Sequence, residues 1–213
     1  MDTFSNRFVV FAGGVILGCI VFFSAGFTVG TSALKLRIKT TPVPSVREVF
    51  ATPIPDADTR VTKKPFGLYV SPKDSPVSPE RFTGYHVGVD FETTPEEQAI
   101  DVPFFAICTG PLLEKKTATG YGGVVTQACT FAGRSVSVIY GHIRLTSVNV
   151  KANELILVGQ RIGVLGKGFT TQTGGERKHL HVGVYVGPSS TIRGYEPTLG
   201  ALSSWMNVVD YFR

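Results

Sequence analysis

The stretch that decides the fold is HLHVGVYV at residues 179–186, near the C-terminal end of the chain. Its alternating valines and its tyrosine are typical of a β-strand. Because side chains two positions apart in a strand point to the same side, His179 and His181 are predicted to share one face. On its own, this pair is equally consistent with two hydrogen-bonded core histidines, so the other histidines have to be considered with it.

A second segment with the same character is YHVGVDF at residues 85–91. If it forms a strand, His86, Gly88 and Asp90 lie on one face, and Gly88 leaves space between the imidazole and the carboxylate. The fourth histidine of the chain is His142, in YGHI. Taken alone, it would be a satisfied polar residue, but burying several imidazoles beside a carboxylate is costly unless a metal or hydrogen bonds pair them. The set therefore favours a metal site.

Two histidines and one aspartate form a ligand set that suits catalytic zinc. Zinc in such sites takes three protein ligands of nitrogen and oxygen type and keeps a fourth position open. The two remaining histidines are then available for chemistry. The sequence thus predicts a metal centre with two further imidazoles beside it.

Three motifs resemble the lysostaphin and LytM-type zinc metallopeptidases, which hydrolyse peptidoglycan peptides. The family pattern is His-x-Gly-x-Asp, then Tyr-x-His, then His-x-His. It stands here in the same order at residues 86–90, 140–142 and 179–181. Softer matches extend the resemblance over about residues 65–187, including a glycine-rich hairpin at 120–123.

Carried over residue by residue, the resemblance implies a definite site. It implies that His86, Asp90 and His181 bind one zinc ion per chain, and that His142 and His179 are catalytic. It leaves open which of the two catalytic histidines is the general base.

The fold class expected is all-β. Fifteen Phe and seven Tyr, together with abundant Val, Thr and Gly, favour sheet. The resemblance implies a compact antiparallel β-sandwich or distorted barrel, with the zinc ion on the floor of a groove. The chain departs from the family pattern at residues 92–100, where an acidic stretch replaces a short run of small residues. We expect this stretch to alter the groove and to leave the metal site intact.

The net charge of +5 does not indicate nucleic-acid binding. Lys and Arg outnumber Asp and Glu by 8 to 4 in the first 64 residues, but only by 13 to 12 in the remainder. The excess positive charge therefore lies beside an apolar segment, where it would meet lipid headgroups. We expect no nucleic-acid partner.

The apolar segment is FVVFAGGVILGCIVFFSAGFTVG at residues 8–30. It contains no charged residue and exceeds the roughly 20 residues that a membrane-spanning helix needs. We predict one N-terminal transmembrane helix that anchors the chain. A cleaved signal peptide is the alternative, although its apolar region would be only about 7–15 residues long.

Residues 31–64 are predicted to form a Pro-rich connector, and residues 65–213 the metallopeptidase domain. Charge bias alone would place the domain in the cytoplasm, because three basic residues follow the apolar segment and only Arg7 and the terminal amine precede it. The peptidoglycan substrate that the resemblance implies lies outside the cytoplasmic membrane and therefore requires the opposite orientation. We therefore expect a single-pass protein of the cytoplasmic membrane with its catalytic domain outside.

Cys108 and Cys129 lie in neighbouring strand-like segments on either side of a hairpin. They would pair in an oxidising compartment, or else be two buried small apolar residues. Side-chain directions in one sequence do not decide between these alternatives.

The function expected from these features is a membrane-anchored zinc metalloendopeptidase that hydrolyses peptide cross-links of bacterial peptidoglycan. The first alternative is a non-hydrolytic wall-binding regulator that activates a separate amidase. Degenerate relatives of that kind typically lose metal ligands, whereas this chain keeps all of them. The second is an anchored structural module whose zinc ion serves only stability. The expected partners are peptidoglycan and, through the N-terminal helix, the membrane; a protein regulator is left open.

Overall fold

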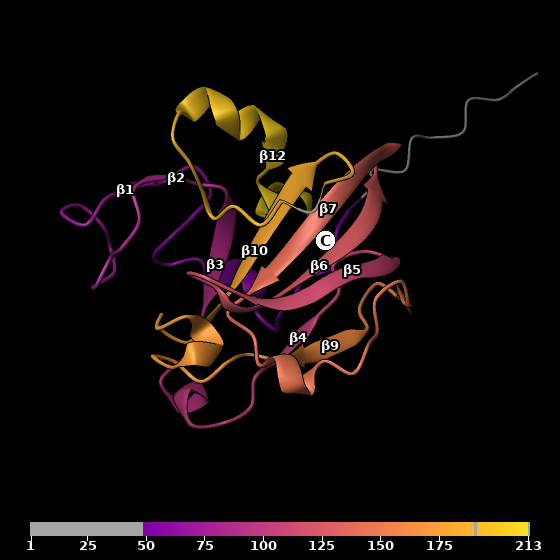
Figure 1. Ribbon diagram of the computed structural model, residues 1–213, viewed down its shortest axis with the longest axis horizontal. Helices are drawn as coiled ribbons and strands as arrows, with labels where there is room; N and C mark the ends of the chain where they lie inside the picture. Colours follow the sequence, from indigo (N-terminus) through magenta and orange to yellow (C-terminus); the bar gives the residue numbers. More distant parts are fainter. Residues whose placement is uncertain (1–48, 190, 213) are drawn as a thin grey trace, which may run out of the picture. The chain divides into compact units, whose positions relative to one another are not determined.

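The computed structural model describes residues 49–189 and 191–212. In this part of the chain the secondary structure is almost entirely antiparallel β, joined by short 3-10 helices (Figure 1). This confirms the expectation of a mostly β domain. The sheets of the described residues do not close into a barrel, so the distorted barrel that we held open is not observed.

The largest sheet has seven strands, and β10 (His179–Val186) pairs with three of the others. On one side β10 pairs with β7 (Arg134–Gly141). On the other side its first half pairs with β3 (Gly88–Glu92) and its end pairs with β12 (Trp205–Met206). Beyond β7 the sheet continues through three strands: β6 (Gly122–Phe131), β5 (Gly110–Ala118) and β8 (Leu155–Ile156).

Two smaller sheets and six 3-10 helices complete the described structure. One sheet has the order β1 (Tyr69–Val70), β2 (Gly84–His86) and β11 (Tyr195–Glu196); the other pairs β4 (Pro103–Phe105) with β9 (Arg161–Val164). The helices are η1 (Ala57–Thr59), η2 (Glu96–Gln98), η3 (Leu145–Ser147), η4 (Thr171–Thr173), η5 (Leu199–Ser204) and η6 (Val208–Tyr211).

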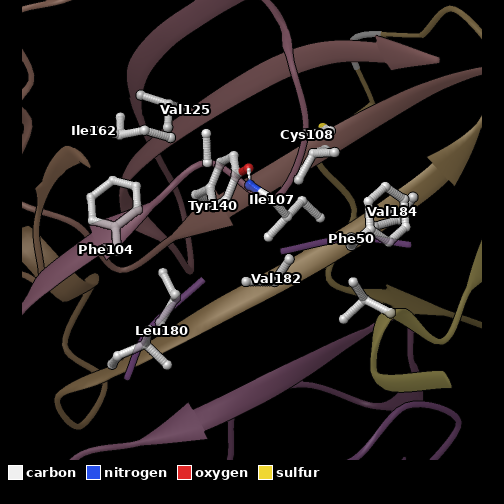
Figure 2. Close-up of a cluster of buried hydrophobic side chains, with 14 of the residues drawn as sticks. Phe50, Phe104, Ile107, Cys108, Val125, Tyr140, Ile162, Leu180, Val182 and Val184 are labelled. Atoms are coloured by element: carbon white, nitrogen blue, oxygen red, sulfur yellow. Dashed lines mark hydrogen bonds between the residues drawn. The ribbon is translucent and has the colours of Figure 1, made fainter. Parts of the chain in front are cut away.

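Strands β10, β7 and β6 are buried on both faces. Because side chains alternate along a strand, one face of β10 contributes to the hydrophobic core and the other to the candidate site. Leu180, Val182 and Val184 of β10 point into the main hydrophobic core. Figure 2 shows these three side chains on the same side of the strand. Their neighbours His179 and His181 must point to the opposite face. That face therefore receives the candidate site, and the core behind it holds the strand in place.

Tyr140, the tyrosine of the Tyr-x-His motif, belongs to the core and not to the site. Its side chain is fully buried and packs against Phe104 (Figure 2). Its hydroxyl donates a hydrogen bond to Gln127 Oε1 (3.0 Å) and accepts one from the backbone N–H of Ile107 (3.0 Å). Because Tyr140 is the second-last residue of β7, two residues before His142, these contacts help fix the position of that histidine.

The structure corrects the predicted boundary between connector and domain. Residues 49–64, which we assigned to an extended connector, pack against the domain: Phe50 and Ile54 are at most 1% exposed. The backbone N–H of Phe50 donates to the carbonyl of Tyr211, and that of Ala51 donates to the carbonyl of Ile107. The prediction failed here because the buried apolar residues follow no period of 2 or 3.6 among the prolines. The rest of the predicted connector lies outside the described residues.

Cys108 and Cys129 form a disulfide, with their Cα atoms 6.2 Å apart. The alternative left open by the sequence is thereby decided in favour of pairing. The bond closes a loop of 21 residues across the hairpin and ties the segment after β4 to the central sheet. Both cysteines belong to the main core.

The predicted transmembrane helix at residues 8–30 lies outside the described part of the chain. Among the residues that the structure does describe, no helix has the length and apolar character needed to cross a bilayer.

Candidate metal centre

Two strands bring the aspartate and a histidine together. In the antiparallel pair of β3 and β10, Asp90 lies directly opposite His181, and Glu92 lies directly opposite His179. Residues opposite one another in such a pair project to the same face of the sheet. Because His179 and His181 share one face, as predicted, both imidazoles lie beside Asp90.

His86 reaches the same point from a different sheet. Residues 85–91, expected as one strand, form β2 and β3 with a break at Val87, and the chain changes sheets there. His86 ends β2, where it lies opposite Tyr195 of β11. His86 and Asp90 are four residues apart in the sequence, and although they belong to different sheets, their side chains are in contact.

Three potential ligand atoms converge in this place. His86 Nε2 lies 3.1 Å from His181 Nδ1 and 3.3 Å from Asp90 Oδ1. His181 Nδ1 lies 3.0 Å from the same carboxylate oxygen. All three side chains are buried, with at most 3% of each residue exposed. This is the set that we predicted as the zinc ligands.

Hydrogen bonds on the outer side of each imidazole determine which nitrogen faces the cluster. His86 Nδ1 is 3.1 Å from the carbonyl oxygen of Pro65, which can only accept, so Nδ1 carries the proton and Nε2 keeps its lone pair. His181 Nε2 is 3.1 Å from the hydroxyl of Tyr121, which itself donates to the carbonyl of Arg193 (3.3 Å). His181 Nε2 is therefore the donor, and Nδ1 presents its lone pair.

The donor set fits a zinc ion. Two imidazole lone pairs and a carboxylate oxygen face one another in a buried site, which is unfavourable unless a cation lies among them. Ligand atoms at about 2.0–2.1 Å from a tetrahedral zinc ion stand about 3.3–3.4 Å from each other. The separations of 3.0 to 3.3 Å observed here are close to that value. Outer hydrogen bonds of the kind made by Pro65 and Tyr121 are usual for metal-binding histidines.

The protonation states agree with this interpretation. Burial lowers the pKa of His181 to about 4, so its imidazole is neutral at pH 7. For Asp90, burial alone would raise the pKa, but the imidazoles of His179 and His86 hold the pKa of the carboxyl well below its usual range. Neutral imidazole and ionised carboxylate are the forms that bind metals.

Gly88 leaves space for the side chain of His181. The sequence had suggested instead that it leaves space between the imidazole of His86 and the carboxylate of Asp90. A Cβ atom added at Gly88 would lie 2.6 Å from His181 Cε1 and 2.6 Å from the carbonyl oxygen of Val182. We expect Gly88→Ala to lower the free energy of unfolding by about 1–3 kcal/mol, as overpacking does, because the backbone contact cannot yield easily. Urea unfolding of the full-length variant measures this.

The matched control is Gly200→Ala, since no atom lies within 4 Å of an added Cβ at that position. We expect the control to change the free energy of unfolding by less than about 0.5 kcal/mol. Equal effects of the two substitutions would show that Gly88 is not needed for close packing of His181.

His142 and His179 lie next to the cluster, with their ring centroids 4.2 Å apart. His142 directly follows β7 in a left-handed backbone conformation (φ 63°), which is rare outside glycine. Its Nδ1 donates to the carbonyl oxygen of Thr173 (3.0 Å), so Nε2 is an acceptor in the neutral ring. Burial, followed by the neighbouring His179, holds the pKa of His142 well below its usual value.

His179 has acceptors at both ring nitrogens. Nδ1 lies 3.0 Å from the carbonyl oxygen of Arg177, and Nε2 lies 3.2 Å from Asp90 Oδ2. The two predicted catalytic histidines thus differ in hydrogen bonding: His142 offers a lone pair, and His179 is placed to donate.

The three candidate ligands and the two neighbouring histidines line one cavity of about 730 Å³: His86, Asp90, His181, His142 and His179. That volume is within the usual range for ligand sites. Its walls also include aromatic side chains, Phe82, Tyr121 and Tyr195, and the cation Lys64, which is paired with Glu80 at 2.5 Å. The structure therefore brings together every site residue predicted from the sequence.

Sequence reasoning missed several residues that shape the site. Tyr121 orients His181, Thr173 orients His142 through its carbonyl, and Arg177 contacts Asp90 (2.9 Å). A usable signal existed only for Tyr121, an aromatic residue within the glycine-rich run at 120–123. Backbone carbonyls such as that of Thr173 leave no trace in residue identity.

The fold and the cluster together define a class: an antiparallel β domain with a candidate two-histidine, one-aspartate metal centre in a cavity. No protein-family model matches the sequence, and no curated protein does. Solved structures do match. A chain of the SpoIIQ–SpoIIIAH pore-forming complex is 18% identical, with a TM-score of 0.51; the match covers 78% of this chain and 92% of that one.

Two further structures are similar at lower scores. Csd3 of Helicobacter pylori is 20% identical with a TM-score of 0.48, over 78% of this chain and 35% of Csd3. LytU is 21% identical with a TM-score of 0.47, over 70% of this chain and 80% of LytU. This chain thus spans about a third of the length of Csd3. At 18% identity, the match to the chain of the SpoIIQ–SpoIIIAH complex shows the fold alone.

Proposed function

We propose that this protein is a zinc-dependent endopeptidase that hydrolyses peptide cross-links of bacterial peptidoglycan. The observation that carries the proposal is the convergence of three lone-pair-bearing atoms, from His86, Asp90 and His181, in a cavity that also holds two more histidines. A purely structural metal site would have no use for an adjoining cavity lined by further imidazoles.

In this proposal His86, Asp90 and His181 hold the zinc ion. Bound zinc supplies a Lewis acid that polarises a carbonyl group and acidifies water. Tyr121 and the carbonyl of Pro65 hold the two imidazoles in the tautomers that ligation requires.

The two remaining histidines have different roles. His142 accepts a proton at Nε2, because its Nδ1–H is engaged by the carbonyl of Thr173. His142 then returns that proton to the departing amine, and His179 donates a hydrogen bond to the developing oxyanion once its Nε2–H turns away from Asp90 Oδ2. This assigns the general base, which the sequence left open, to His142.

The location proposed is the outer side of a cytoplasmic membrane, reached by a single N-terminal span. The disulfide between Cys108 and Cys129 supports an oxidising compartment, since such bonds are rare in the cytoplasm. Together with the resemblance to wall hydrolases, this favours peptidoglycan as the substrate.

The test is incubation of the full-length chain with purified peptidoglycan, with and without a zinc chelator, followed by mass spectrometry of the released fragments. We expect new amino and carboxyl termini within the peptide cross-links, their loss on chelation, and their return when zinc is restored. Absence of new termini from a zinc-loaded, folded sample would overturn the proposal.

A second candidate is a non-hydrolytic regulator that activates a separate amidase. It is favoured by one observation: the structure that matches with a TM-score of 0.51 is a chain of the SpoIIQ–SpoIIIAH complex, which suggests a protein partner. The two candidates separate in one experiment, because a regulator would stimulate an added amidase equally well with His142→Ala. An endopeptidase requires that side chain.

A further inference from the structure

The two oxygens of the Asp90 carboxylate have separate surroundings. Oδ1 faces the ligand cluster, at 3.0 Å from His181 and 3.3 Å from His86. Oδ2 points the other way and accepts a hydrogen bond from Arg177 Nη2 at 2.9 Å, with His179 Nε2 at 3.2 Å. Arg177 is therefore bonded to the oxygen that the cluster does not use.

Arg177 is itself held by a second carboxylate. Its Nε donates to both oxygens of Glu92, at 3.0 and 2.9 Å, and its Nη2 also donates to Glu92 Oε1. Glu92 lies two residues after Asp90 on β3, so the two carboxylates are on the same face of the strand. One guanidinium thus bridges two neighbouring carboxylates, with only 12% of its side chain exposed.

The backbone that carries Arg177 is also fixed. The next residue, Lys178, donates from Nζ to the carbonyl oxygens of Glu97 (2.7 Å) and Ile100 (2.5 Å). The hydroxyl of Thr93 donates to the carbonyl of Lys178 (2.6 Å). The acidic stretch 92–100, which departs from the family pattern, is therefore the support on which this segment rests.

Charge balance explains why Glu92 accompanies Arg177. A cationic guanidinium beside Asp90 would by itself weaken the attraction of the site for a divalent cation. Glu92 cancels that charge, so Asp90, Arg177 and Glu92 together carry the same net charge of −1 as Asp90 alone. These three groups therefore leave the net charge beside Asp90 unchanged; Glu92 also pairs with the exposed Lys63, whose Nζ lies 3.8 Å from Oε2, where solvent screens the charge.

Stability alone is a poor explanation for this group. Arg177 Nη1 is buried and has no hydrogen-bond partner among the described residues. An unsatisfied buried donor costs free energy, and buried ion pairs often contribute little net stability.

We propose that Arg177, held by Glu92, is a positioning residue that turns the Asp90 carboxylate so that Oδ1 alone is presented to the metal. The inference rests on the proposed metal site and adds two residues to it. Groups that hydrogen-bond a metal ligand, as Arg177 does with Asp90, typically affect metal affinity about 10–100-fold.

The test measures zinc affinity of the full-length chain by competition with a chelator of known affinity. Arg177→Met is expected to weaken zinc binding about 10–100-fold. Glu92→Gln is expected to weaken it similarly, because it leaves an uncompensated cation beside Asp90. The double variant is expected to equal Arg177→Met within about threefold, since the two residues act as one unit.

Two variants separate positioning from general effects of charge and folding. Arg177→Lys keeps the positive charge but loses the planar guanidinium that bonds both carboxylates, so its zinc affinity should fall between those of the parent and Arg177→Met. Arg81→Met removes another Arg–Glu ion pair, with Glu176 at 2.7 Å, that does not contact Asp90. We expect the Arg81 variant to bind zinc like the parent.

The outcomes distinguish this inference from the proposed function. If the parent chain binds no zinc, the metal site itself is wrong. If the parent binds zinc and Arg177→Met binds it equally well, Arg177 has no positioning role, and the metal site stands. If Arg177→Met fails to fold, Glu92→Gln and Arg177→Lys decide, and parental affinity in both would overturn the inference.

Discussion

His181→Ala is expected to abolish zinc binding and, with it, peptidoglycan hydrolysis. The substitution removes the ligand atom Nδ1, which stands 3.1 Å from His86 Nε2 and 3.0 Å from Asp90 Oδ1. Structural zinc sites bind with roughly 10–16 kcal/mol, shared among a few ligands, so losing one of three should cost affinity on the order of a thousandfold or more. Metal analysis after dialysis and chelator competition measure the loss.

A folded protein is required for that comparison. Removing His181 leaves the hydroxyl of Tyr121 without its donor and opens a small cavity, so the variant should also be checked by unfolding of the metal-free form. Stoichiometric zinc retained by a folded His181→Ala chain would contradict the assignment of this histidine as a ligand.

His142→Ala is expected to keep its zinc and lose its turnover. His142 lies beside the cluster, but its outer nitrogen bonds to Thr173 and it is not among the three atoms that converge. Loss of a general base typically lowers the rate by about 10²–10⁴-fold. The measurement is kcat on peptidoglycan fragments at saturating zinc, together with metal content.

The two substitutions control one another, because each removes one buried imidazole from the same cavity. The assignment requires opposite results for metal content and the same result for hydrolysis. If His142→Ala lost zinc as completely as His181→Ala, His142 would be a ligand and not the base.

Much of the site was predictable because strand geometry converts spacing into direction. The period of two in HLHVGVYV places His179 and His181 on one face, and the alternating core residues behind them confirm it. The four histidines of the chain and the spacing of Asp90 from His86 indicated a metal site, whereas the choice of His86, Asp90 and His181 as ligands came from the resemblance to the LytM-type peptidases. The mostly β class also followed from composition, and its antiparallel arrangement was implied by the resemblance.

What the sequence did not predict depends on contacts between distant backbone segments. The break at Val87, which sends His86 and Asp90 into different sheets, lies within a run that has the pattern of one strand. The packing of residues 49–64 is directed by a few apolar side chains among prolines, without periodicity. No sequence pattern marks Arg177, and its contact with Asp90 depends on how β10 and the residues before it lie against β3.

The most direct test of the account is anomalous diffraction at the zinc absorption edge from crystals of the full-length chain grown with zinc. The account predicts one strong peak bonded to His86 Nε2, Asp90 Oδ1 and His181 Nδ1, at about 2.0–2.2 Å from each. A zinc-saturated crystal with no peak among these three atoms, or with its peak on other ligands, would contradict it.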